Sequence, residues 1–524
     1  MRSKRSNRKI MMNKIFIIST LLVLASCVQE QTYDWHISGG KVIDGTGSEA
    51  FQADVLIRDD QIAYVGEVDP DTINAQNRHD ATGYYVTPGF IDPHAHGNAT
   101  ENPEFENFLA MGVTTIILGQ DGRGPSIDEF ADLLDEVDQK QPSVNVGYLV
   151  GHNSIRRDSG VEHDDPDEDG LQRMVDMVFE GIETGAFGLS LGLEYNYGEH
   201  SEMEELVAIA EPVAEYDGVI ISHMRSEDYD KIEDSLKELI EQGRQSGARV
   251  QASHLKIVLG DDPEQADRIL HMMDDARAEG IQITADVYPY NASFTGISIV
   301  FPDWARPPND YDEVVEERRE DLAEYLRNRV NARNGPQATL FGTGDVAGKT
   351  LAEVAEEKGQ PFEEVLIEMG PGSESAAYFV MDEEVMKTFI ADEHTVISSD
   401  GSPTMRHPRG YGAFAKVINE YTSEGGFLEL EEAIRKMSGQ TASIIGLDDP
   451  EKVDLRRGYV RQGFAADLLV FDPDEVVDRA DFENPHQLAE GMERIWVNGH
   501  PVWESNRPVN NEGFGRALRN QIAQ

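Results

Sequence analysis

The chain has 524 residues, which allows one large domain of roughly 250–400 residues together with a smaller accessory domain. Its 98 acidic and 45 basic residues give a formal net charge of −53, which argues against nucleic acid as a partner. A single cysteine excludes an internal disulfide. The acidic residues are spread over nearly every helix-like segment, so we interpret them as a surface solvated for high salt, with a site for a cationic substrate as the alternative.

The first 26 residues have the pattern of an export signal. Basic residues precede an apolar run over residues 15–25, which is too short for a comfortable membrane span. The run ends in Leu24-Ala25-Ser26-Cys27, which resembles a bacterial lipobox, where the cysteine is lipidated and becomes the mature N-terminus. We therefore predict that residues 1–26 are a lipoprotein signal peptide and that Cys27 anchors an exported protein to a bacterial membrane, facing the periplasm or the exterior. The alternative is a buried thiol after an ordinary signal peptide.

Two terminal segments have the pattern of short strands. Residues 33–88 alternate apolar and polar side chains between glycine-containing turns, and the same pattern returns in residues 446–510. We expect the two segments to pair into one small β-sandwich domain.

Residues 89–445 alternate short apolar strands with amphipathic helices, a pattern that predicts a parallel sheet. Eight candidate strands end, in chain order, near His94 and His96, Asp121, His152, Glu194, His223, His254, Tyr288 and Asp400. Eight such units predict an α/β protein with a TIM-like (β/α)8 barrel, whose functional groups belong at the carboxyl ends of the strands. The interval between the last two strand ends, Tyr288 and Asp400, is several times longer than the others. This length predicts an inserted helical subdomain at about residues 296–390.

The predicted strand ends carry metal-ligand residue types. His94 and His96 are two residues apart, so both rings project from one face of a strand end and can share a cation. His223, His254 and Asp400 close three further strands. A single histidine is more simply interpreted as structural, but four histidines and a carboxylate at barrel strand ends match the ligand chemistry of Zn²⁺.

Longer motifs surround these residues. Residues 88–96 resemble the first-strand motif of the amidohydrolase superfamily, and residues 222–227, 253–256 and 397–401 resemble the fifth-, sixth- and eighth-strand motifs of D-aminoacylases. Further similar segments extend from about Tyr33 to Glu504. The chain thus resembles the D-aminoacylase, or N-acyl-D-amino-acid deacylase, family.

The resemblance implies a function and a set of roles. It implies one or two Zn²⁺ per chain, with His94 and His96 at the more exposed metal and His223 and His254 at the tighter one. Asp400 is implied as metal ligand and proton shuttle. Lys256, Tyr288 and Arg409 are implied in binding the substrate carboxylate. The implied reaction is hydrolysis of N-acyl-D-amino acids, or of related acylated or D-residue-containing dipeptides, by a metal-activated water.

One position of the predicted metal site departs from the family. Asp121, in Gly119-Gln120-Asp121-Gly122, stands where relatives carry a metal-binding cysteine. A carboxylate can ligate or bridge Zn²⁺, so we predict that Asp121 is a metal ligand. Two alternatives remain: Glu194 is the bridging group, or Asp121 caps the following helix or hydrogen-bonds a loop amide.

Other functions on the same barrel are a cyclic amidase and a deaminase. A non-catalytic, substrate-binding lipoprotein is the non-enzymatic alternative. The four histidines together with Asp400 argue against the binding protein, because binding alone needs neither a hydroxide generator nor a proton shuttle.

Overall fold

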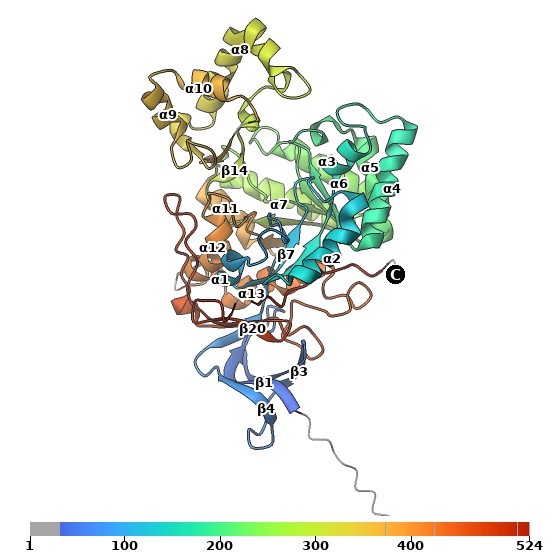
Figure 1. Ribbon diagram of the computed structural model, residues 1–524, viewed down its shortest axis with the longest axis vertical. Helices are drawn as coiled ribbons and strands as arrows, with labels where there is room; N and C mark the ends of the chain where they lie inside the picture. The colour runs from blue at the N-terminus through green and yellow to red at the C-terminus, as the bar shows by residue number, and fades with distance from the viewer. Residues whose placement is uncertain (1–31, 373, 424, 511, 523–524) are drawn as a thin grey trace, which may run out of the picture.

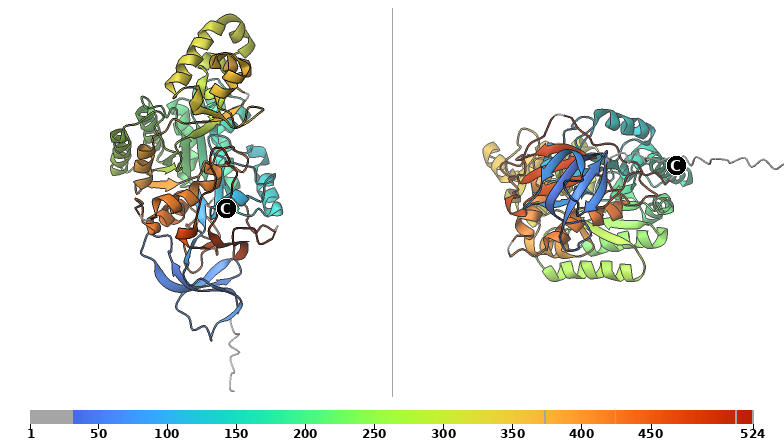
Figure 2. Two further views of the ribbon diagram at one scale, coloured as in Figure 1. Left: turned by 90° about the vertical axis from the view of Figure 1, so that its left-hand side faces the viewer. Right: turned by 90° about the horizontal axis from the view of Figure 1, so that it is seen from below.

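The computed structural model describes residues 32–522 except 373, 424 and 511. Three parts are stacked along the long axis: a β domain at the bottom, a barrel in the middle, and a subdomain with α8 to α10 at the top (Figure 1; Figure 2, left). The predicted signal segment and Cys27 lie outside the described residues.

The middle part is a barrel of parallel strands. Hydrogen bonds define the strand orders β6-β7-β8 and β9-β10-β11-β12-β13-β17. The strands are β6 (Phe90–Asp92), β7 (Val113–Leu118), β8 (Asn145–Tyr148), β9 (Val150–Gly151), β10 (Gly188–Gly192), β11 (Val219–His223), β12 (Arg249–Ala252), β13 (Ile283–Val287) and β17 (Thr395–Ile397). Only Leu149 separates β8 from β9, and two backbone bonds close the ring between β17 and β6: Asp400 N donates to His94 O, and His96 N donates to Gly401 O. Counting β8 and β9 as one strand, the barrel has the eight strands that the sequence predicts.

Helices surround the strands and explain their composition. The helices include α2 (Phe130–Lys140), α4 (Glu168–Thr184), α5 (Met203–Glu215), α6 (Ile232–Ser246), α7 (Pro263–Ala278), α11 (Glu383–Ala391), α13 (Leu430–Met437) and α14 (Gly439–Ile445). Helices cover the outer face of the barrel, and packed side chains fill its interior. Strands such as β7, with the sequence VTTIIL, are therefore buried at every position. Helix starts are encoded locally, as where Asp262 caps α7 ahead of Pro263.

The β domain combines both ends of the chain. Its strands are β1 (Thr32–Val42), β2 (Phe51–Arg58), β3 (Gln61–Gly66), β4 (Asn74–Asp80), β5 (Tyr85–Pro88), β18 (Leu468–Phe471), β19 (Met492–Val497) and β20 (His500–Glu504). They form one sheet, ordered β20-β19-β18-β5-β1-β2-β3 with β4 on β1. Ile62 N, in β3, donates to Phe464 O just before β18, so the sheet curls around a core that includes Val55, Leu468 and Trp496. The expected sandwich is therefore one curled sheet, seen end-on in Figure 2, right.

The subdomain between β13 and β17 differs from the prediction. Besides α8 (Tyr311–Ala332), α9 (Leu351–Lys358) and α10 (Phe362–Met369), it contains an antiparallel sheet of β14 (Ser293–Gly296), β16 (Ser375–Tyr378) and β15 (Thr339–Phe341). It is thus not purely helical. Helix α11 packs on α7 and β17 and belongs to the barrel, so the insert occupies about residues 293–380 instead of 296–390. Strands of three or four residues have too few alternating apolar and polar positions for the sequence pattern to predict them.

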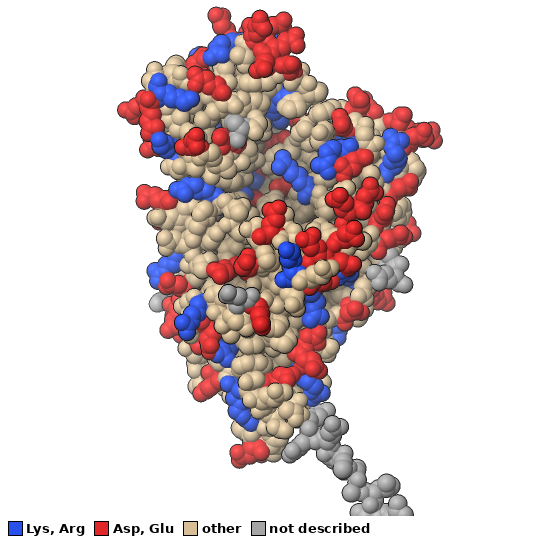
Figure 3. Space-filling view, viewed as in Figure 1, with Lys and Arg blue, Asp and Glu red and all other residues tan. Residues whose placement is uncertain are grey.

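Acidic side chains spread over all three parts of the face in Figure 3, with basic side chains between them. This distribution is the one expected of a solvated acidic surface. Within residues 32–522, as far as they are described, no helix is long and apolar enough to cross a bilayer.

A buried polar network joins the β domain to the barrel. Asp467, next to β18, forms an ion pair with Arg457 and accepts hydrogen bonds from Asn498 N at 2.6 Å and from Asn145 Nδ2 at 3.2 Å. Asn145 belongs to barrel strand β8, and Asn498 follows β19. All four side chains are at most 5% exposed, so the charges have little access to solvent.

We predict that Asp467→Asn lowers the free energy of unfolding by about 3–5 kcal/mol, because it leaves the buried Arg457 guanidinium without its counter-charge. Urea unfolding followed by fluorescence measures the effect. Asp474→Asn, an exposed change nearby, is the control and should shift stability by less than about 0.5 kcal/mol. Equal stabilities of the two variants would show that the network does not hold the domains together.

Candidate active site

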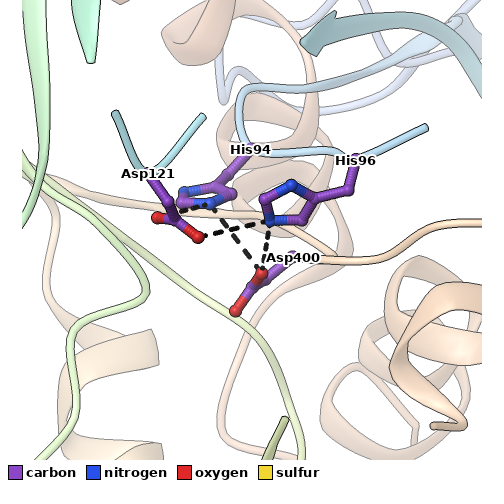
Figure 4. A group of neighbouring side chains, drawn as sticks. All are labelled: His94, His96, Asp121 and Asp400. Carbon is purple, nitrogen blue, oxygen red and sulfur yellow. Dashed lines mark hydrogen bonds and ion pairs between the residues drawn. The ribbon is translucent and has the colours of Figure 1, made fainter. Parts of the chain in front are cut away.

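A first cluster of metal-ligand side chains lies at the carboxyl ends of β6, β7 and β17 (Figure 4). It comprises His94, His96, Asp121 and Asp400, whose ligand atoms lie within 4.8 Å of one another. Nε2 of His96 is 3.1 Å from Asp400 Oδ1 and 3.5 Å from Asp121 Oδ2. His94 Nε2 is 3.4 Å from Asp121 Oδ1. Two imidazoles and two carboxylates thus converge on one point.

A second cluster shares a member with the first. Asp121, His223 and His254 also bring ligand atoms within 4.8 Å of one another, at the ends of β7, β11 and β12. Asp121 Oδ1 is 3.4 Å from His254 Nε2 and 3.7 Å from His223 Nδ1. The Asp121 carboxylate therefore lies between two histidine pairs.

The loop after β7 fixes this carboxylate. Asp121 has a left-handed backbone with φ 55°, and Gly122 follows with φ 75°. A Cβ on Gly122 would lie 1.9 Å from Asn153 Oδ1, so only glycine fits against the neighbouring strand ends. The next helical turn starts at Ile127 with Ser126 as its N-cap, so Asp121 is not a helix cap.

Unpaired buried atoms at the site match a cation. Both ring nitrogens of His94 and Oδ1 of Asp121 are buried, and none of them has a hydrogen-bond partner among the described residues. Such atoms are rare in folded proteins unless a ligand, ion or water satisfies them. Burial opposes the ionisation of Asp121, yet the neighbouring imidazoles, His94 first, hold its pKa well below the usual range. A carboxylate with a lowered pKa, placed among imidazole nitrogens, is a donor set that suits Zn²⁺.

The predicted substrate-binding residues lie beside these clusters. Arg409 is 2% exposed; its Nη1 lies 2.8 Å from Asp400 Oδ2, and its guanidinium lies 4.6 Å from the Tyr288 ring centroid. Lys256 Nζ lies 2.7 Å from Glu227 and 2.8 Å from His254 Nδ1. The structure thus gathers every predicted site residue that it describes.

These groups face a cavity of about 650 Å³. Barrel residues form its floor, and the insert contributes Phe294, Thr295, Ile299 and Arg333 to its wall. The volume suits a small organic molecule, and both polar and apolar side chains face it. The insert therefore covers the metal-ligand clusters and helps to shape the space above them.

Comparison with known proteins agrees with this geometry. A model described as "Amidohydrolase family" matches residues 383–503. D-aminoacylase of Alcaligenes xylosoxydans xylosoxydans is 29% identical to this chain, and the match covers 94% of this chain and 99% of that protein. N-acyl-D-glutamate deacylase of the same organism is 30% identical, and the match covers 94% of this chain and 97% of that protein. This chain belongs to the N-acyl-D-amino-acid deacylase family of amidohydrolases. The resemblance inferred from the motifs is confirmed.

A solved structure extends the comparison to three dimensions. The crystal structure of N-acyl-D-glutamate deacylase from Bordetella bronchiseptica, in complex with zinc and a phosphonate mimic of the tetrahedral intermediate, is 29% identical. It covers 93% of this chain and all of its own, with a TM-score of 0.79. The present chain therefore shares the deacylase fold over nearly its whole length.

Glu194 occupies a different position from Asp121. Its Oε2 lies 3.2 Å from His223 Nε2, whereas His223 Nδ1 faces His254 at 2.9 Å. Glu194 therefore contacts the outer side of the His223 ring, and it is not a member of the cluster around His94 and His96. The geometry places Asp121, and not Glu194, between the two histidine pairs.

Sequence reasoning missed two buried carboxylates behind the histidines. Asp286 accepts hydrogen bonds from His254 N at 2.9 Å and from Ser398 Oγ at 2.7 Å, and its Oδ1 is 3.8 Å from His94 Nδ1. Glu227 is 3.0 Å from His254 Nδ1. Carboxylates in such positions orient ligand imidazoles. Glu227 lies inside the family-like motif of residues 222–227, and Asp286 is an acidic residue within the buried strand β13; these two positions were the available signal.

We predict that Asp121→Ala lowers metal content and activity together, because it removes the oxygen shared by both clusters. Asp121→Cys should recover much of the metal affinity, since thiolate is the softer zinc ligand. Glu194→Gln is the matched control and should keep its metal. Elemental analysis after gel filtration measures occupancy, and full occupancy in Asp121→Ala with loss in Glu194→Gln would assign the bridge to Glu194.

Proposed function

We propose that this deacylase-family chain hydrolyses the amide bond of N-acyl-D-amino acids, or of related acylated dipeptides, with one or two Zn²⁺. The observation that carries the proposal is the Asp121 carboxylate between two histidine pairs, beside Asp400 and Arg409, on the floor of a covered cavity. The relatives named above are deacylases of linear amides, which favours this reaction over a cyclic amidase or a deaminase.

The side chains of the site can bind the metal, transfer the proton and bind the substrate. His94, His96, Asp121, His223, His254 and Asp400 would hold the metal, which when bound polarises an acyl carbonyl and lowers the pKa of water. Asp400 can accept a proton at one carboxylate oxygen and return it to the departing amine. The Arg409 fork can bind a substrate carboxylate with two parallel hydrogen bonds.

Charge arrangement around Asp400 supports its role as a base. Burial opposes its ionisation, but the Arg409 guanidinium and the contact with His96 hold its pKa below the usual range. Asp400 therefore remains an acceptor at neutral pH. A substrate carboxylate that binds Arg409 would compete with Asp400 for the guanidinium and so would lie next to the proton shuttle.

Paired substrates test the proposed function. The purified enzyme, with its metal measured, is incubated with N-acetyl-D- and N-acetyl-L-amino acids, and the released amine is quantified. We expect hydrolysis of D substrates, loss of activity after chelation, and its return with Zn²⁺. An enzyme that carries metal but releases no amine from any N-acyl-D-amino acid would contradict the proposal.

Asp400→Asn should reduce kcat by about two to four orders of magnitude while the protein keeps its fold and most of its metal, because an amide cannot accept the proton. Steady-state kinetics and elemental analysis check both parts. Near-normal turnover by this variant would remove Asp400 from the mechanism.

We also propose that the protein is exported and lipid-anchored through Cys27. The support is the order of the N-terminal segments: basic residues, an apolar run over residues 15–25, then Leu24-Ala25-Ser26-Cys27. The short apolar run suits a cleaved signal better than a membrane span. The described residues start close behind Cys27, with β1 at the end of the molecule remote from the insert (Figure 1). An anchor there would leave the cavity pointing away from the membrane.

Cys27→Ala should abolish lipidation and leave the uncleaved precursor, because the thiol is the acylation site. Metabolic labelling with a fatty-acid analogue and fractionation in a Gram-negative host measure this. A wild-type protein found unlabelled and entirely in the soluble fraction would refute the anchor.

A further inference from the structure

Four basic side chains line the active-site cavity: Arg123, Lys256, Arg333 and Arg409. Three of them are at most 5% exposed and are paired with carboxylates. Lys256 lies 2.7 Å from Glu227, Arg333 Nη1 lies 3.2 Å from Asp228, and Arg409 Nη1 lies 2.8 Å from Asp400. Each of these three side chains thus has a carboxylate partner, which Arg333 shares with Arg329.

Arg123 is different. It is exposed at the cavity, and among the residues that the structure describes no carboxylate lies within ion-pair distance of it. Its guanidinium instead lies 5.7 Å from the ring centroid of Tyr195. A cation held on an aromatic face keeps its hydrogen-bond donors free, so Arg123 can bind an anion without breaking another pair.

The position of Arg123 indicates which half of a substrate it meets. Arg123 follows β7 and faces Tyr195 after β10, whereas Arg409 pairs with Asp400 after β17 and stacks on Tyr288 after β13. In the ring of eight strands, these two groups lie on opposite sides of the metal-ligand clusters. If Arg409 and Asp400 hold the amino-acid half, the acyl half extends toward Arg123.

Tyr195 connects this side of the cavity to the metal ligands. Its ring centroid is 4.3 Å from that of His223, and its hydroxyl is 3.1 Å from Thr295 Oγ1 of the insert. The Arg123 guanidinium is thus one aromatic ring removed from a metal-ligand imidazole. A short acyl chain that passes Tyr195 can bring its far end to Arg123.

We propose that Arg123 is a specificity-determining residue that binds a carboxylate at the far end of the acyl group, so that the preferred substrates carry short dicarboxylic acyl groups, succinyl or glutaryl. This inference rests on the proposed function and names its acyl half. The same charge disfavours an acyl half that carries a free amine, such as the N-terminal residue of a dipeptide. Glu194 and Glu374 also line the cavity, but Glu194 contacts His223, and Glu374 accepts a hydrogen bond from Thr343.

The test compares matched pairs of substrates. N-succinyl and N-glutaryl derivatives of one D-amino acid are assayed against the same compounds with the terminal carboxylate converted to an amide. The ratio of the two kcat/KM values measures recognition of the charge alone. We expect a ratio of about ten for the wild type, the size of one charge-assisted hydrogen bond at a partly exposed site.

Variants assign the preference to Arg123. Arg123→Gln should bring the ratio close to one, Arg123→Glu should bring it below one, and Arg123→Lys should keep part of it because the charge remains without the planar fork. Arg268→Gln is the matched control: Arg268 is an exposed arginine on α7 outside the cavity, and its loss should leave the ratio unchanged. Melting temperature and zinc content verify that each variant is folded and loaded.

The outcomes separate this inference from the proposed function. If wild-type enzyme hydrolyses N-acetyl-D-amino acids but shows no preference for the carboxylate over its amide, or keeps the preference in Arg123→Gln, the inference is overturned and the proposed function stands. If no N-acyl-D-amino acid is hydrolysed at all, the proposed function fails. A ratio that falls in Arg123→Gln and survives in Arg268→Gln supports the inference.

Discussion

The Asp121 carboxylate, held between two pairs of imidazoles, is the interaction on which the rest of the site depends. Its Oδ1 lies within 3.4 Å of both His94 and His254, which come from opposite clusters. A buried carboxylate oxygen that accepts no hydrogen bond from any described residue is unfavourable unless a cation compensates it. The site therefore favours a bound cation, and it has the imidazole and carboxylate ligands that bind one.

The surrounding fold makes this arrangement rigid. Asp121, His254 and Asp400 all have left-handed backbones, with φ of 55°, 35° and 49°, a conformation that non-glycine residues rarely adopt. Such residues persist where neighbouring structure holds them, and they cluster at functional sites. Here the barrel holds them from behind, through Asp286 on the backbone of His254 and through the bond from Asp400 N to His94 O. These backbone contacts thus fix the ligand residues at the strand ends.

Much of this could be predicted from the sequence, because the barrel strands are short buried runs and most of them end within a few residues of a polar side chain. That pattern locates His94, His223, His254 and Asp400 at strand ends without knowledge of the fold. It does not give distances between strands, so the choice between Asp121 and Glu194 needed the structure. Both follow strands, but Glu194 contacts the outer side of His223, while Asp121 reaches both clusters.

Other features depend on tertiary contacts that no local pattern encodes. The insert contains strands of three or four residues that are stabilised by one another, so its sheet was not foreseen. The assignment of α11 to the barrel follows from its packing on α7 and not from its own sequence. Likewise, Arg409 and Arg123 are both arginines near strand ends. Only the structure shows that Arg409 is buried against a carboxylate, whereas Arg123 lies over the Tyr195 ring and has no ion pair with any residue that the structure describes.

The most direct test of this account is a crystal structure of the zinc-loaded enzyme with anomalous diffraction recorded at the zinc edge. The account predicts a metal peak at each histidine pair, with the Asp121 carboxylate in contact with both. A structure in which zinc binds without contact to Asp121, or in which Glu194 takes the bridging position, would contradict it.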